Sequence, residues 1–212
     1  MLHVKEIFKS IQGEGYYSGK IAVFVRFTGC NLWNGKIEDR QKSICNFCDT
    51  DFVGTNGSNG GIYDEKNLVD KIDLVWNQQK INYEKKFVVL TGGEPMLQVT
   101  YRLVDLLKKK GYFVALETNG TINNTKINFD WVCVSPKKLF NWLLKEGDEI
   151  KIVFPQPYFN LNIIKKMKFK YFLLQPMDGP KKQVNIWNTL NYCKSHKPWF
   201  PSFQIHKCLN IR

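Results

Sequence analysis

Long apolar runs are missing from this sequence. No stretch approaches the roughly 20 consecutive apolar residues that a membrane-spanning helix needs, so a membrane-embedded protein of that kind is not expected. Residues 1–7 also lack the apolar stretch of a signal peptide and already include a glutamate. We therefore expect a cytoplasmic protein with no membrane partner.

A disulfide framework is not expected either, because the six cysteines of a cytosolic chain should stay reduced. Three of them, Cys30, Cys45 and Cys48, crowd into one polar loop, whereas the other three are scattered. Cys133 is one of the scattered cysteines and lies in the apolar run 131–134, which indicates a small buried hydrophobic residue.

Acidic residues are few relative to basic ones, 19 against 31, which gives a formal net charge of +12. Such an excess can indicate nucleic-acid binding. Here, however, lysine clusters at 108–110 and 165–168, near the ends of expected helices, where the helix dipole favours cations. We expect no direct nucleic-acid partner. A basic surface also suits anionic small substrates or an acidic redox partner.

No internal repeat or low-complexity linker interrupts the 212 residues, and 43% of them are hydrophobic, so we expect one domain over residues 1–212. Short apolar runs alternate with amphipathic stretches. The expected strands are residues 4–8, 21–27, 87–90, 112–117, 131–134, 149–154, 171–174 and 202–205. The expected helices are residues 67–79, 99–107, 161–167 and 184–196, and residues 54–61 form a glycine-containing loop.

Alternating strands and helices imply parallel pairing with right-handed crossovers. Polar segments follow most of the expected strands, and active sites of barrel-like α/β folds lie at the carboxyl ends of their strands. Six or seven parallel strands are too few to close a barrel. The predicted fold is therefore α/β, an incomplete (β/α) barrel with mostly parallel strands, an open side, and its site at their C-terminal ends.

The cysteine loop has the spacing C-x14-C-x2-C. Two thiolates two residues apart can point at one metal centre, and a third completes a tripod. A structural zinc normally has four protein ligands, whereas a 4Fe-4S cluster with three thiolates leaves one iron open. From the cysteines alone, an iron–sulfur cluster and a zinc site completed by His206 both remain open.

The segment Thr91-Gly92-Gly93-Glu94-Pro95 ends an expected strand and begins a helix. It can be explained as a tight turn with backbone freedom at its glycines. Alternatively, the glycines let backbone groups approach a ligand closely. Together with the three loop cysteines, the segment resembles the GGEP motif of radical S-adenosylmethionine (SAM) enzymes. The resemblance implies that it meets the methionyl amino group of SAM.

A closer resemblance extends from the N-terminus to the last residues. The segments that carry it are residues 12–15, 26–33, 47–52, 117–120, 134–137, 175–179 and 204–207. Together they resemble the 7-carboxy-7-deazaguanine synthase family, including a subgroup with the C-x14-C-x2-C spacing. The resemblance implies a carbon–nitrogen lyase that converts 6-carboxy-5,6,7,8-tetrahydropterin to 7-carboxy-7-deazaguanine with loss of ammonia, by way of a SAM-derived radical. The product would serve deazapurine synthesis, including queuosine.

The resemblance also implies roles for individual residues, with the chemistry carried by the SAM-derived radical. Cys30, Cys45 and Cys48 would hold the 4Fe-4S cluster, and Thr50 would bind Mg2+. Residues expected to face SAM are Phe47, Cys48, Asp49, Gly93, Glu117, Ser135, Pro136, Lys137, Gln175, Pro176, Met177 and Asp178. Residues expected to contact the substrate are Ile11, Gln12, Gly13, Arg26, Thr91 and Arg212.

Three residues of the sequence each fit two roles. Arg26 suits a bidentate bond to the substrate carboxylate, but it could also be a structural cation at a strand end. Glu14 and His206 could line the pocket or serve only the local fold. The resemblance implies a homodimer and a flavodoxin-like or other one-electron donor. The competing functions are another radical SAM activity, such as an activase, and a basic zinc-containing RNA-binding module.

Overall fold

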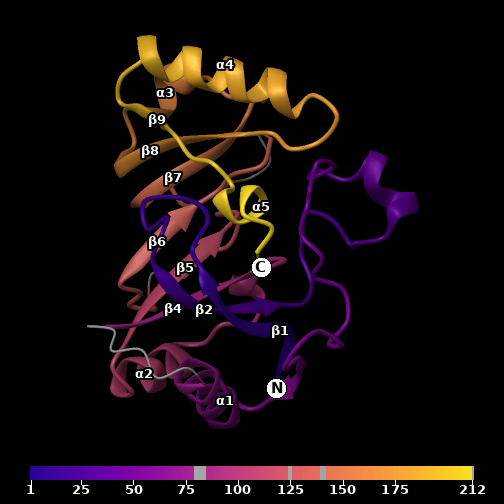
Figure 1. Cartoon of the computed structure of the whole chain (residues 1–212), viewed down its shortest axis with the longest axis vertical. Helices are drawn as coiled ribbons and strands as arrows, with labels where there is room; N and C mark the ends of the chain where they lie inside the picture. The colour runs from indigo at the N-terminus through magenta and orange to yellow at the C-terminus, as the bar shows by residue number, and fades with distance from the viewer. Residues whose placement is uncertain (79–84, 124–125, 139–141, 212) are drawn as a thin grey trace.

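The computed structural model describes residues 1–78, 85–123, 126–138 and 142–211 (Figure 1). Its strands are β1 (Leu2–Ile11), β2 (Ile21–Phe27), β3 (Gly61–Tyr63), β4 (Lys86–Gly92), β5 (Tyr112–Thr118), β6 (Trp131–Val134), β7 (Glu146–Phe154), β8 (Lys168–Pro176) and β9 (Trp199–Pro201). Its α-helices are α1 (Glu65–Asn77), α2 (Tyr101–Lys109), α3 (Leu161–Ile164), α4 (Lys182–Ser195) and α5 (Ile205–Cys208). Two 3-10 helices, η1 (Ile37–Lys42) and η2 (Pro95–Leu97), complete the set.

All nine strands belong to one sheet with the order β3-β1-β2-β4-β5-β6-β7-β8-β9. Seven strands pair in parallel with their neighbours, namely β2, β4, β5, β6, β7, β8 and β9. Strand β1 pairs antiparallel with both β2 and β3. Within the described residues, β3 and β9 are the two edges and do not pair with each other. The α/β class and the incomplete, mostly parallel barrel predicted from the sequence are confirmed.

The sheet is covered on its outside by helices whose apolar faces the sequence sets. In α2, for example, Leu103, Val104 and Leu107 lie on one face and are buried. The helix begins where the Thr100 hydroxyl accepts a hydrogen bond from the Leu103 amide at 3.1 Å. Figure 1 shows α1 and α2 at one end of the sheet and α3 and α4 at the other. This layout gives two separate outer cores.

The inner face of the sheet carries a third, largely aromatic core. Its buried members are Ala22, Phe87, Val89, Ala115 and Trp131, which lie near the amino ends of β2, β4, β5 and β6. Aromatic rings therefore fill the barrel at that end. The carboxyl ends of the parallel strands remain for polar groups.

Two expectations about the chain's course are corrected. The last strand is Trp199–Pro201, not residues 202–205, because the backbone turns after Pro201 and Ile205 begins α5. The expected loop over residues 54–61 ends one residue early, because Gly61 begins β3, whose three residues are too few for an apolar pattern. None of the described helices has the length and apolar character to cross a bilayer.

Candidate functional site

A cavity of about 320 Å³ lies at the carboxyl ends of the parallel strands. It brings together nearly all residues that the sequence assigned to the site. From that set, the lining includes Ile11, Gln12, Gly13, Arg26, Cys30, Cys45, Phe47, Cys48, Asp49, Thr50, Thr91, Gly93, Glu117, Ser135, Lys137, Gln175, Pro176 and Asp178. Residues more than 160 positions apart thus share one space. This is the location that parallel α/β folds favour for ligands.

The cysteine loop contributes three thiols to the cavity. The Cys45 thiol donates a hydrogen bond to Cys48, and this bond is the main cause that lowers the pKa of Cys48 to about 6. The same bond, followed by burial, raises the pKa of Cys45. The positive charge of Lys137 favours the thiolate of both residues. Burial also raises the pKa of Cys30. Thiolate is the form that binds metal, so among these three thiols the surroundings favour that form at Cys48.

The thiols do not form a site for a single ion. Among the residues that the structure describes, no three His, Cys, Asp or Glu side chains are arranged to hold one metal ion. The zinc site completed by His206 therefore gains no support from this geometry. A 4Fe-4S cluster is larger than one ion, and each thiolate binds a different iron. Three thiols that line one cavity fit that group.

The turn after β4 fastens the cysteine loop to the sheet. A Cβ added at Gly93 would lie 1.9 Å from the Gly29 carbonyl oxygen, so only glycine allows this approach. The fully buried Glu94 accepts hydrogen bonds from the Met96 and Asn119 amides and the Thr118 hydroxyl. The turn therefore ties the start of the cysteine loop, β4 and the end of β5 together, in addition to lining the cavity at Gly93.

Glu117 and its neighbours form the polar wall of the cavity at the ends of β4 and β5. Its carboxylate accepts hydrogen bonds from Gln12 Nε2 at 3.0 Å and from Thr91 Oγ1 at 3.1 Å. Arg26 also lines the cavity, and its Nε donates to Glu6 Oε1 at 2.9 Å. This bond fixes the direction of the guanidinium. Arg26 therefore fits both interpretations, because it is paired with Glu6 and also lines the cavity.

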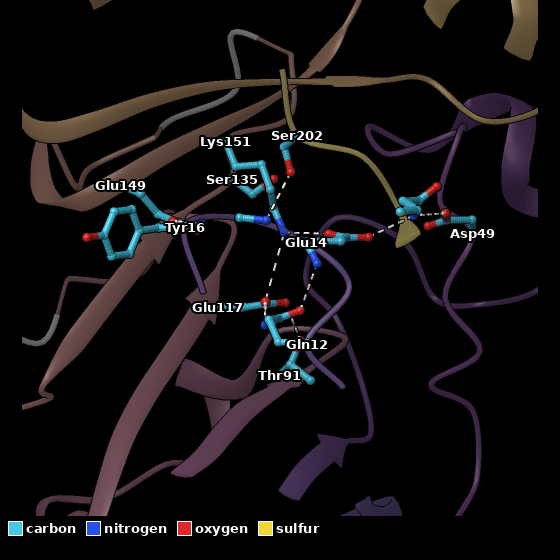
Figure 2. A network of polar contacts seen from close by, with 12 residues as sticks. Gln12, Glu14, Tyr16, Asp49, Thr91, Glu117, Ser135, Glu149, Lys151 and Ser202 are labelled. Atoms are coloured by element: carbon cyan, nitrogen blue, oxygen red, sulfur yellow. Dashed lines mark hydrogen bonds and ion pairs between the residues drawn. The ribbon is translucent and has the colours of Figure 1, made fainter. Parts of the chain in front are cut away.

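Lys151 is a member of the site that the sequence analysis missed. It is 4% exposed, lies on β7, and pairs with Glu14 at 2.5 Å and with Glu117 at 3.9 Å (Figure 2). Burial alone would lower the pKa of Lys151, but the carboxylates of Glu117 and Glu14 outweigh it and raise the pKa well above its ordinary value. Two charged residues at alternate positions of an apolar strand, Glu149 and Lys151, were the signal that could have indicated it.

The C-terminal segment closes one side of the cavity. Gln204 donates to Glu14 at 2.8 Å and to Asp49 at 2.9 Å, and Lys207 of α5 pairs with Asp49 and Asp178 at 2.5 Å each. These bonds connect the cysteine loop to the end of β8. His206 also lines the cavity and lies against Gly13. Glu14 and His206, both left open by the sequence, therefore belong to the site.

The remaining predicted residues fall in four groups. Lys137 donates from Nζ to the Ser135 carbonyl and hydroxyl oxygens, so these two act together. Gln175 is buried, and its Oε1 has no hydrogen-bond partner among the described residues. Pro136 and Met177 do not line the cavity. Arg212 lies outside the described residues.

No family model matches the chain, but individual proteins are similar to it over nearly its whole length. A 7-carboxy-7-deazaguanine synthase of Burkholderia multivorans is 48% identical over 209 residues, which cover 98% of each chain. One of Bradyrhizobium diazoefficiens is 46% identical over 209 residues, 99% of this chain and 98% of that one. The crystal structure of QueE from Escherichia coli is 26% identical with a TM-score of 0.63, covering 96% of this chain and 93% of that chain. The chain belongs to the 7-carboxy-7-deazaguanine synthase family.

Proposed function

We propose that the chain converts 6-carboxy-5,6,7,8-tetrahydropterin to 7-carboxy-7-deazaguanine with loss of ammonia, as a SAM-dependent radical enzyme of deazapurine and queuosine synthesis. One observation carries the proposal beyond the family assignment. A single cavity joins the three thiols of the cysteine loop to a polar wall made by Arg26 and Glu117. A radical generated at a cluster must reach a substrate in the same water-shielded space.

In this proposal, Cys30, Cys45 and Cys48 hold a 4Fe-4S cluster in the C-x14-C-x2-C subgroup of the family. When bound, the cluster supplies the electron that cleaves SAM reductively. The residues proposed to face SAM all line the cavity, namely Phe47, Cys48, Asp49, Gly93, Glu117, Ser135, Lys137, Gln175, Pro176 and Asp178. Gln175 supports this placement because its buried Oε1 lacks a partner within the described residues and would accept a bond from a ligand. Pro136 and Met177, which the sequence also assigned to SAM, do not line it and stand beside residues that do.

The substrate side consists of Ile11, Gln12, Gly13, Arg26, Thr91 and Arg212, with Mg2+ held through Thr50. The pterin is anionic, and Arg26 offers a planar guanidinium that Glu6 holds in direction, which suits a bidentate bond to a carboxylate. Mg2+ prefers oxygen ligands and keeps several waters, so one hydroxyl is a reasonable protein contact. Thr50 lines the same cavity.

We also propose the wider setting of the enzyme. It would act in the cytoplasm as a homodimer, with a single radical SAM domain over residues 1–212. Its electron would come from a flavodoxin-like or other one-electron donor. The net charge of +12 supports a donor with an acidic surface, because opposite charges speed the encounter.

The cysteines provide the test of this proposal. We expect the anaerobically prepared protein to be brown and to contain about four irons and four sulfides per chain. Cys30→Ala, Cys45→Ala and Cys48→Ala should each lose SAM cleavage, because each removes a ligand. Cys193→Ala and Cys208→Ala are the matched controls, since neither residue lines the cavity, and they should keep it.

A colourless protein with one zinc would contradict the proposal and favour the RNA-binding alternative. Full iron loading and turnover in Cys45→Ala would contradict the ligand assignment.

A further inference from the structure

The turn between β1 and β2 carries part of the cavity wall. Gln12, Gly13 and Glu14 line the cavity, and the chain then continues through Gly15 and Tyr16 to Tyr17, which packs against the aromatic core of the barrel. The φ angle of Gly15 is +71°, a conformation that favours glycine. The direction in which Gln12 and Glu14 point therefore depends on what holds the chain at residues 15 and 16.

Two buried side chains hold the backbone at that point. The Gly15 amide donates to Ser202 Oγ at 2.9 Å, and the Tyr16 amide donates to Glu149 Oε2 at 2.8 Å (Figure 2). A Cβ added at Gly15 would lie 2.5 Å from Glu149 Oε1, so the carboxyl also fills the space beside the turn. Neither Ser202 nor Glu149 lines the cavity. Both lie outside the cavity and hold the backbone of the turn that forms part of its wall.

Aromatic rings set how deeply the turn enters the barrel. The Tyr16 ring stacks on Trp131 with centroids 5.1 Å apart and lies 4.1 Å from the Tyr171 ring. Tyr17 meets Trp131 edge to face at 4.7 Å. Trp131 belongs to β6 and Tyr171 to β8. The turn is therefore anchored on three sides, by β7, by the segment after β9, and by the aromatic core.

Glu149 makes polar contacts that an apolar residue at its position would lack, and the positive charge of Lys151 favours its ionised form. It is 3% exposed, and its pKa is raised chiefly by burial. A buried carboxyl is unfavourable unless its bonds are needed. Its bonds go to the Tyr16 amide and the Cys133 thiol. The bond to the Tyr16 amide is the one that reaches the cavity wall.

We propose that Glu149 is a positioning residue, which with Ser202 fixes the turn so that Gln12 and Glu14 face the substrate. This inference rests on the proposed function, because it assumes that the pterin occupies the wall that the turn forms. Misplacement of binding groups by about 1 Å can lower a rate about 100-fold. Loss of the anchor should therefore act on substrate use and leave the cluster side intact.

The experiment compares Glu149→Ala, Glu149→Gln and Ser202→Ala with the wild-type holoenzyme. We expect Glu149→Ala to raise the pterin KM and lower kcat/KM at least about tenfold, with the KM for SAM and the iron content unchanged. Glu149→Gln keeps an oxygen that can accept from the Tyr16 amide, and should restore kcat/KM to within about threefold of the wild type. Hydrogen exchange should become faster over residues 13–17 in the alanine variant and not in the glutamine variant.

Asp148→Ala is the matched control. Asp148 is the neighbouring residue on β7, and its carboxylate accepts from the Val132 amide at 2.8 Å, so the variant loses the same kind of bond elsewhere on the strand. It should leave the pterin KM and the exchange of residues 13–17 unchanged. Ser202→Ala tests the second anchor if Glu149→Ala does not fold, and should raise the pterin KM without affecting the KM for SAM.

The outcomes distinguish a failure of the proposed function from a failure of the positioning role of Glu149. A wild-type holoenzyme that cleaves SAM but makes no 7-carboxy-7-deazaguanine from the pterin would overturn the proposed function and the positioning role with it. An active wild type whose alanine variants at 149 and 202 keep the pterin KM and the slow exchange would overturn the positioning role alone. Equal losses in Glu149→Gln and Glu149→Ala would also overturn it.

Discussion

Replacing Lys151, the buried cation of the site, should lower the free energy of unfolding by a large amount that depends on pH. Lys151→Met keeps much of the side-chain volume but leaves the Glu14 and Glu117 carboxylates without their shared ammonium. At an effective dielectric constant of about 20, an ion pair at 3.9 Å is attractive by about 4 kcal/mol, and the shorter pair by more. Desolvation offsets much of this gain, and breaking a buried pair typically costs about 3–5 kcal/mol. We expect a loss of that size in the free energy of unfolding at pH 7.5.

The pH dependence follows from the Glu14 carboxyl. Burial would raise its pKa, but the ion pair and hydrogen bond with Lys151, together with Gln204, hold it below its ordinary value. In the wild type this contribution is present above the unfolded value of about 4.3 and is lost as the pH falls through the lower folded pKa. Without Lys151, burial dominates and the folded pKa rises, so the variant takes up a proton on folding. The stability deficit of Lys151→Met relative to the wild type should therefore shrink as the pH falls. Between the folded and unfolded pKa values of Glu14, it should shrink by up to about 1.4 kcal/mol per pH unit.

Urea unfolding of the two proteins, prepared identically at pH 5.0, 6.0 and 7.5, measures this effect. The double variant Lys151→Met/Glu14→Gln is the control, because it removes one of the two uncompensated charges and should recover part of the loss at pH 7.5. A deficit that is equal at all three pH values and unchanged in the double variant would show that packing, not charge, explains the role of Lys151.

Three further predictions concern other parts of the site. Thr50→Ala should weaken the Mg2+ dependence of turnover more than SAM binding, and a loss of SAM affinity with an unchanged Mg2+ response would contradict the assigned role. Gly93→Ala should reduce iron loading, because its Cβ would meet the Gly29 carbonyl oxygen at 1.9 Å; normal iron content would show that the turn can shift. The pKa of Asp178 is lowered mainly by the hydrogen bond from Lys207, so this bond stabilises the fold fully above the unfolded value of about 3.9 and is lost as the pH falls through the lower folded pKa. The difference in Tm between wild type and Asp178→Asn should therefore be constant from pH 7 to 5 and shrink only as the pH falls below about 3.9, whereas a difference that disappears near pH 6 would contradict it.

The sequence predicted the parallel part of the fold well because buried strands have a clear signal. Strands β2 and β6 have the expected bounds, and β4 and β5 differ by one or two residues at their ends. The signal fails where a strand is short and at an edge. Strand β9 has three residues, of which Trp199 is buried and Phe200 is exposed, so no continuous apolar run marks it.

The site was predictable in membership but not in its internal contacts. Segments at strand ends identified most of the lining, since the carboxyl ends of parallel strands meet. The pairing of Arg26 with Glu6 depends on the antiparallel register of β1 and β2, which places these residues opposite each other. No local pattern contains that register. Lys151 was missed because the carboxylate that pairs with it, Glu14, is 137 residues away in the sequence.

The central claim is that this cavity turns the pterin into 7-carboxy-7-deazaguanine with SAM as a reusable cofactor. The direct measurement is an anaerobic assay of the reduced holoenzyme with 6-carboxy-5,6,7,8-tetrahydropterin, SAM and Mg2+, in which product and 5′-deoxyadenosine are quantified by mass spectrometry. The account predicts many equivalents of product per equivalent of 5′-deoxyadenosine. SAM cleavage that yields 5′-deoxyadenosine but no 7-carboxy-7-deazaguanine would contradict it.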